Sequence, residues 1–200
     1  MTPNRTPLLP VAIVTALYLT VAAIASVGND NWEFVAYIVV VLFAGAGVAL
    51  LHKQVGLSRG LLWTLSLWGL MHMLGGLLPV PEGWPINGDK RVLYSTWLIP
   101  DYLKYDHIVH AFGFAIATWA VWQSLRSTLI NKTPTAAILF LCALAGMGLG
   151  ALNEIVEFLA VLLIPDTNVG GYLNTGWDLV ANAVGAFGAA IVIGIMTKKK

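Results

Sequence analysis

Six long apolar stretches constrain this sequence more than any other feature. A helix needs about 20 predominantly apolar residues to cross the hydrocarbon core of a bilayer. Only 10% of the 200 residues are charged, whereas soluble domains carry about 25%. We therefore predict an all-α polytopic membrane protein, a six-helix bundle that forms a single transmembrane domain over residues 1–200. The predicted helices are residues 8–27, 32–51, 61–80, 107–125, 135–164 and 177–196.

The fifth stretch and the longest connection differ from the rest. Residues 135–164 would form a helix of about 45 Å, at about 1.5 Å per residue, so this helix must tilt, protrude or loosen. Its glycines Gly146, Gly148 and Gly150 are expected to pack closely against small residues of the sixth stretch, which are Gly185, Ala186, Gly188 and Ala189. Prolines and a glycine in residues 81–106 make a long helix improbable there.

The basic residues predict the orientation. Eight lie on the side of the N-terminus and three on the other side, so the positive-inside rule places both termini in the cytoplasm. The eight are Arg5, Lys53, Arg59, Arg126, Lys132, Lys198, Lys199 and Lys200. The first stretch, with Arg5 and the small residues Ala23 and Ala25, also resembles a signal peptide. Cleavage there would leave five spans and would not change the outward-facing polar residues described next.

All ten carboxylates lie on the outer side or in the outer half of a predicted span. Six are interpreted as ordinary boundary charges: Asp30, Glu33, Glu82, Asp89, Asp101 and Asp166. The other four enter apolar helices together with His72, His107 and His110; they are Asp106, Glu154, Glu157 and Asp178. Ionisable residues inside a bilayer are costly and mark functional sites by default.

The spacing of these residues indicates a cluster of imidazole and carboxylate groups. Asp106 and His110 are four residues apart and share a helix face. Glu154 and Glu157 also share a face and could not both stay ionised in a low dielectric without a cation or a proton. Because the single cysteine excludes a thiolate cluster, a metal would take nitrogen and oxygen ligands.

Plainer interpretations exist for several positions. His72 and Asn182 could make only interhelical hydrogen bonds, and His107 could lie in the headgroup layer. Asp178 could be a first-turn residue of a helix capped by Thr175.

Four segments resemble the YjdF-like bacterial inner-membrane proteins. They are HMLGG at 72–76, YDHIVHAFG at 105–113, NEIVEF at 153–158 and WDLVANAVG at 177–185. The last three are also similar to the VanZ-like membrane proteins associated with glycopeptide resistance. The resemblance selects Asp106, His110, Glu157 and Asp178 first, and then His72, Glu154 and Asn182. The chain departs from the VanZ-like pattern where an arginine usually precedes the final aspartate, because Asn168, Asn174 and Thr175 occupy that region.

The leading hypothesis is a metal-dependent enzyme, a hydrolase or transferase that acts on a lipid or lipid-linked substrate at the outer leaflet. The expected metal ligands are His72, His110 and Glu157, with zinc as the first choice and manganese or iron as alternatives. Asp106, Glu154 and Asp178 are the expected catalytic residues, and His107, Asn153 and Asn182 are expected neighbours of the site. A cation or proton transporter and a non-catalytic lipid-binding protein are the alternatives. Membrane lipids are the expected partners, and no motif indicates nucleic-acid binding.

Overall fold

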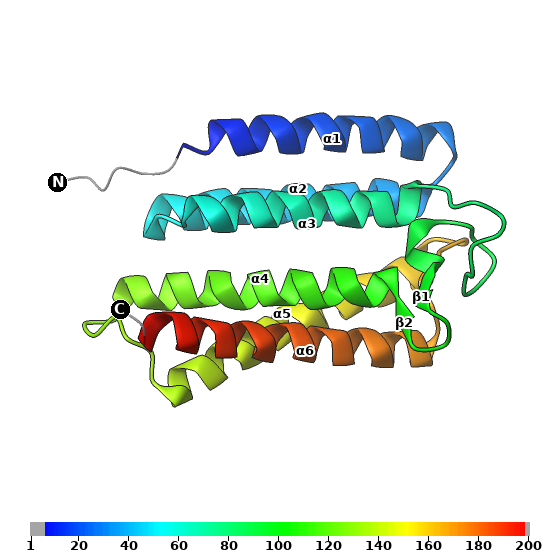
Figure 1. Ribbon diagram of the computed structural model, residues 1–200. Coiled ribbons are helices and arrows are strands. Elements are labelled where there is room, and N and C mark those ends of the chain that lie inside the picture. The colour runs from blue at the N-terminus through cyan, green and yellow to red at the C-terminus, as the bar shows by residue number, and fades with distance from the viewer. Residues whose placement is uncertain (1–6, 199–200) are drawn as a thin grey trace.

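The computed structural model describes residues 7–198 and contains six long helices arranged side by side (Figure 1). All six are long and apolar enough to cross a membrane, so the predicted six-helix bundle is confirmed. The basic residues Arg5, Lys199 and Lys200, on which the predicted orientation partly rests, lie outside the described residues. The helices are α1 Leu9–Gly28, α2 Trp32–Val55, α3 Arg59–Leu77, α4 Tyr105–Thr128, α5 Ala136–Leu163 and α6 Tyr172–Lys198.

Side-chain caps fix the start of three helices. The side chains of Asn31, Ser58 and Thr135 accept hydrogen bonds from the backbone N–H groups three residues later, at the starts of α2, α3 and α5. At the other end of α2, Gly56 adopts a left-handed conformation with φ of 71°, which glycine adopts at little cost. These signals explain why the helix boundaries follow the apolar stretches closely.

The start of α6 differs from the prediction. The helix begins at Tyr172, where the backbone N–H groups of Asn174 and Thr175 both donate to the carbonyl of Gly171. Thr175 is therefore inside the helix and Asp178 is in its second turn. The interpretation of Thr175 as a cap and Asp178 as a first-turn residue was wrong, because the helix extends one turn further toward the glycines that precede it.

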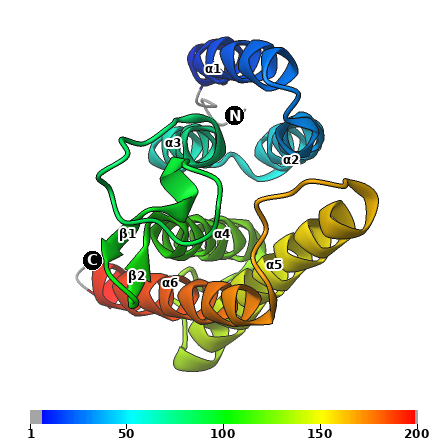
Figure 2. The ribbon, with the colours of Figure 1, turned by 90° about the vertical axis from the view of Figure 1, so that its right-hand side faces the viewer.

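The connection between α3 and α4 folds over one end of the bundle, as predicted without a long helix (Figure 2). It contains a short 3-10 helix, η1 Leu93–Ser95, and two short antiparallel strands, β1 Trp97–Ile99 and β2 Leu103–Lys104. The α5–α6 connection, residues 164–171, lies at the same end. We call this the loop end; the start of α1 and the end of α6 lie at the opposite end (Figure 1).

Small residues bring α4, α5 and α6 close together. A Cβ atom added to Gly185 of α6 would lie 1.9 Å from the backbone oxygen of Ala111 in α4, and one added to Gly146 of α5 would lie 2.0 Å from Oγ1 of Thr118 in α4. Toward α6, an added Cβ at Gly146 would lie 3.4 Å from the Cβ of Ala186, and one at Gly150 would lie 2.8 Å from Nδ2 of Asn182. Nothing lies within 4 Å at Gly148 or Gly188, so the predicted close packing of α5 against α6 holds at Gly146 and Gly150 only. The helix α5 stays continuous and is tilted against its neighbours (Figure 2).

Candidate metal centre

His110 lies at the centre of a polar cluster built from three helices. Its Nε2 atom is 3.5 Å from Oδ1 of Asp106, one turn earlier on α4, and 3.8 Å from Oε1 of Glu157 on α5. Its Nδ1 atom is 3.5 Å from Oε1 of Glu154, also on α5. The i,i+4 and i,i+3 spacings read from the sequence thus bring these four residues to one place in the bundle.

The hydrogen bond between His110 and Asn182 determines which imidazole nitrogen is available. Nδ1 of His110 and Oδ1 of Asn182, on α6, are 3.0 Å apart. An amide oxygen only accepts, so Nδ1 carries the proton, and Nε2 of the neutral ring keeps its lone pair. That lone pair is on the nitrogen nearest Asp106 and Glu157, where a metal ion could use it.

Two groups of side chains could each hold a cation. One comprises Asp106, His110 and Asp178, and the other His110, Glu154 and Glu157; within each group, the candidate ligand atoms lie within 4.8 Å of one another. Glu154 is 8% exposed and Asp178 is fully buried. Both oxygens of Glu154 and Oδ1 of Asp178 have no hydrogen-bond partner among the described residues. Buried carboxylate oxygens without donors are costly, and a cation would satisfy them.

Two asparagines orient two carboxylates of the cluster through hydrogen bonds. Nδ2 of Asn153 donates to Oε1 of Glu157 at 2.7 Å, one helical turn away. Nδ2 of Asn174 donates to Oδ2 of Asp178 at 2.5 Å, again one turn away. Such outer partners fix ligand orientation in metal sites.

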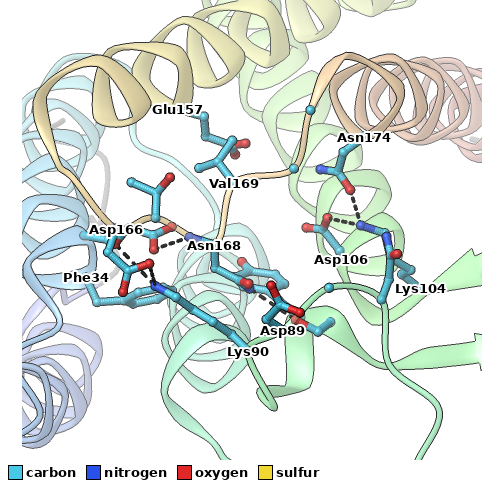
Figure 3. A pocket seen from close by; sticks show the side chains of 18 of the residues that line it. Phe34, Asp89, Lys90, Lys104, Asp106, Glu157, Asp166, Asn168, Val169 and Asn174 are labelled. Carbon is cyan, nitrogen blue, oxygen red and sulfur yellow. Dashed lines mark hydrogen bonds and ion pairs between the residues drawn. The ribbon is translucent and has the colours of Figure 1, made fainter.

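Lys104 belongs to the cluster but was not predicted from the sequence. It is 6% exposed, and its ammonium group lies 3.1 Å from Oδ2 of Asp106 and donates to Oδ1 of Asn174 (Figure 3). The nearest sequence signal was its position two residues before Asp106. This position did not indicate a site residue, because a lysine in an outer loop is usually exposed. Its second partner, Asn174, is 70 residues away in the sequence, so helical spacing could not predict that contact.

His72 does not join either group of candidate ligands. Its Nδ1 forms a hydrogen bond with the hydroxyl of Tyr94 from η1, and its ring is stacked with Phe34 and Trp68. Burial, followed by the negative charges of Asp106 and Glu157, holds the pKa of the Tyr94 hydroxyl well above its usual value. Tyr94 is therefore a neutral proton donor or acceptor at physiological pH.

His107 is also outside both groups. It is buried, its Nδ1 accepts a hydrogen bond from the backbone N–H of Lys104 at 3.3 Å, and its ring lies 6.2 Å from that of Trp177. These contacts tie the start of α4 to α6 and leave Asp106 on the face that points to the cluster.

A cavity of about 400 Å³ connects the cluster with the loop end. Asp106, Glu157 and Lys104 line it, whereas Glu154 and Asp178 do not. Figure 3 shows the α5–α6 connection, with Asn168 and Val169, passing beside the cavity. A ligand in the cavity could therefore reach the metal positions from the side of Asp106 and Glu157.

Glu33 was interpreted as an ordinary boundary charge, and this was wrong. It is 3% exposed, lines the same cavity and accepts a hydrogen bond at 2.7 Å from the backbone N–H of Asn168. The Asn168 side chain in turn donates to Ser95 at 3.3 Å, and Lys90 pairs with Asp166 at 3.1 Å. These contacts fasten the α5–α6 connection to α2 and to the α3–α4 connection.

The chain matches the family described as "Predicted membrane protein (DUF2238)" over residues 7–199. It belongs to this family. Together with the six helices, the match identifies a multi-pass membrane protein. It is consistent with the YjdF-like resemblance, while the VanZ-like resemblance stays a prediction. No curated protein and no solved structure matches the chain.

Proposed function

We propose that this member of the family is a metal-dependent membrane enzyme, a hydrolase or transferase that acts on the headgroup of a lipid or lipid-linked substrate. The observation that carries the proposal is a buried His/Asp/Glu cluster with unpartnered carboxylate oxygens at one side of a polar cavity. One imidazole with several carboxylates suits zinc, manganese or iron.

Different residues of the cluster have different roles in the proposed reaction. His110, Glu157 and Asp106 would hold the cation, and Oδ2 of Asp106 also pairs with Lys104. A divalent cation there would supply Lewis-acid chemistry. Glu154, whose two oxygens are both free of donors, accepts the proton released in the reaction. The ammonium group of Lys104 lines the cavity and stabilises negative charge on the substrate.

The proposed location is the bacterial inner membrane, with both termini in the cytoplasm and the loop end at the outer leaflet. The distribution of basic residues supports this orientation. Membrane lipids are then the surrounding solvent and the source of substrate. Two features favour an enzyme over a transporter. The cavity lies at the loop end of the bundle. Further toward the opposite end, fully buried Thr118 and Ala186 pack against Gly146 and fill the space between the helices there.

Elemental analysis of the purified protein tests the metal. We expect bound metal in wild type and at least a tenfold loss in His110→Ala and Glu157→Gln. Ser66→Ala, which removes a hydroxyl paired with Thr15 away from the cluster, should retain the metal. A metal-free wild type that also fails to bind added zinc, manganese or iron would overturn the proposal.

Incubation with a total membrane lipid extract tests the chemistry. Mass spectrometry should detect a headgroup product that appears with wild type, disappears with a chelator and is absent with Glu154→Gln. Metal binding without any product would instead support the non-catalytic lipid-binding alternative.

A further inference from the structure

We propose that the cluster binds two divalent cations rather than one. This inference rests on the metal site of the proposed function and concerns its stoichiometry. The starting observation is that the two groups of candidate ligands share only His110. Asp106 and Asp178 belong to one group, and Glu154 and Glu157 to the other.

Each position has its own unsatisfied buried oxygen. Oδ1 of Asp178, on α6, lacks a donor in the first group, and both oxygens of Glu154, on α5, lack donors in the second. Within each group the candidate ligand atoms are already close enough together to surround one ion. A single cation in one group would leave the orphaned oxygens of the other group unsatisfied.

His110 can complete only one of the two positions. Its Nδ1 donates to Asn182, so Nε2 is its single free ligand atom. The other position must therefore be completed by carboxylates, whose two oxygens can bridge neighbouring metals about 3.5–4 Å apart. Glu157, whose Oε1 lies 3.8 Å from Nε2, is placed to form such a bridge, whereas Oδ2 of Asp106 is already paired with Lys104.

The formal charge of the cluster is compatible with two cations, and two would make the site positive. Four carboxylates face one ammonium group, that of Lys104, which gives a formal charge of −3 with neutral His110. One divalent cation leaves −1 in a buried site, and two leave +1. A net positive centre beside the cavity would attract an anionic headgroup, which narrows the substrate class to lipids with a phosphate or carboxylate group.

Metal titration of the purified, chelator-stripped protein tests this inference. We expect two manganese ions per chain by elemental analysis after desalting, and an electron paramagnetic resonance spectrum of two exchange-coupled ions. Asp178→Asn and Glu154→Gln should each reduce the count to one and abolish the coupled spectrum. Glu82→Gln, at an exposed position outside the cavity, should retain both ions.

The outcomes separate the two proposals. One ion per wild-type chain, or two ions without coupling, overturns the two-metal site and leaves the proposed enzyme standing. No ion overturns both. Two coupled ions in Asp178→Asn would also overturn the assignment. If that variant does not fold, the number of metal ions per wild-type chain and the wild-type spectrum still decide between one and two metal ions.

Discussion

Asn182 on α6 accepts a hydrogen bond from Nδ1 of His110 on α4, across 3.0 Å, and this bond directs the other imidazole nitrogen toward Asp106 and Glu157. The pair lies between two helices that small residues bring into close contact. Helix packing and ligand orientation are thus coupled in this protein.

Asn182→Leu should weaken metal binding without removing any ligand. The substitution takes away the acceptor that fixes the His110 tautomer, and loss of such an outer partner typically costs 10–100-fold in affinity. Competition with a chelator of known affinity measures the change. Ser66→Ala serves as the control, and an unchanged affinity in Asn182→Leu would contradict the orienting role.

Gly185→Ala should force α4 and α6 apart. The new methyl group would lie 1.9 Å from the backbone oxygen of Ala111, and backbone cannot move aside as a side chain can. We expect a loss of about 1–3 kcal/mol in unfolding free energy together with weaker metal binding. Gly188→Ala is the matched control on the same helix, with nothing within 4 Å, and should be neutral or slightly stabilising. Equal effects of the two variants in thermal unfolding would refute this account.

Lys104→Met should destabilise the metal-free protein more than the metal-bound protein. The ammonium group balances Asp106 in a buried pair, and removing one partner of such a pair costs about 3–5 kcal/mol. A bound cation compensates for part of that loss. Thermal unfolding with and without metal measures the difference. Lys90→Met breaks a pair with Asp166, whose side chain is 84% exposed, and should cost less than about 1 kcal/mol in either state.

Glu33→Ala should loosen the α5–α6 connection. It removes the acceptor of the Asn168 backbone N–H, and a hydrogen bond to a charged group contributes about 1.5–3 kcal/mol. Hydrogen exchange in residues 165–171 should therefore accelerate by roughly 10–100-fold. Glu33→Gln keeps an oxygen acceptor and should show a smaller increase, whereas Asp30→Asn should show none. Unchanged exchange in Glu33→Ala would mean that other contacts hold the connection.

Tyr94→Phe should make stability less sensitive to alkaline pH. Burial raises the pKa of Tyr94 in the folded protein, so this group stabilises the fold below the usual tyrosine value of about 10. That contribution is lost as the pH rises, because only the unfolded chain releases the proton readily. Wild type should exceed Tyr94→Phe in unfolding free energy at neutral pH, owing to the bond with His72. The difference should shrink above pH 10, and a constant difference across that range would contradict the prediction.

The sequence allowed some of these features to be predicted and concealed others for physical reasons. The six helices follow from apolar length, and the meeting of Asp106 with His110 follows from helical spacing. The role of Glu33 could not be predicted, because its partner Asn168 is 135 residues away and an acid at a helix start is common. The position of Tyr94 against His72 depends on how an irregular connection folds back, which no periodic pattern specifies.

The order of the helices in the chain has a consequence for biogenesis. The centre needs α4, α5 and α6 together, and α6 is the last of the six to leave the ribosome. Asp106 and Glu157 therefore enter the membrane before Asp178 and Asn182 have been synthesised. A chain truncated before residue 172 would keep Asp106 and Glu157 but lack the residues of α6 that surround them. Such a product should be unstable in the membrane and should be degraded by membrane proteases, whereas removal of Lys199 and Lys200 should be tolerated.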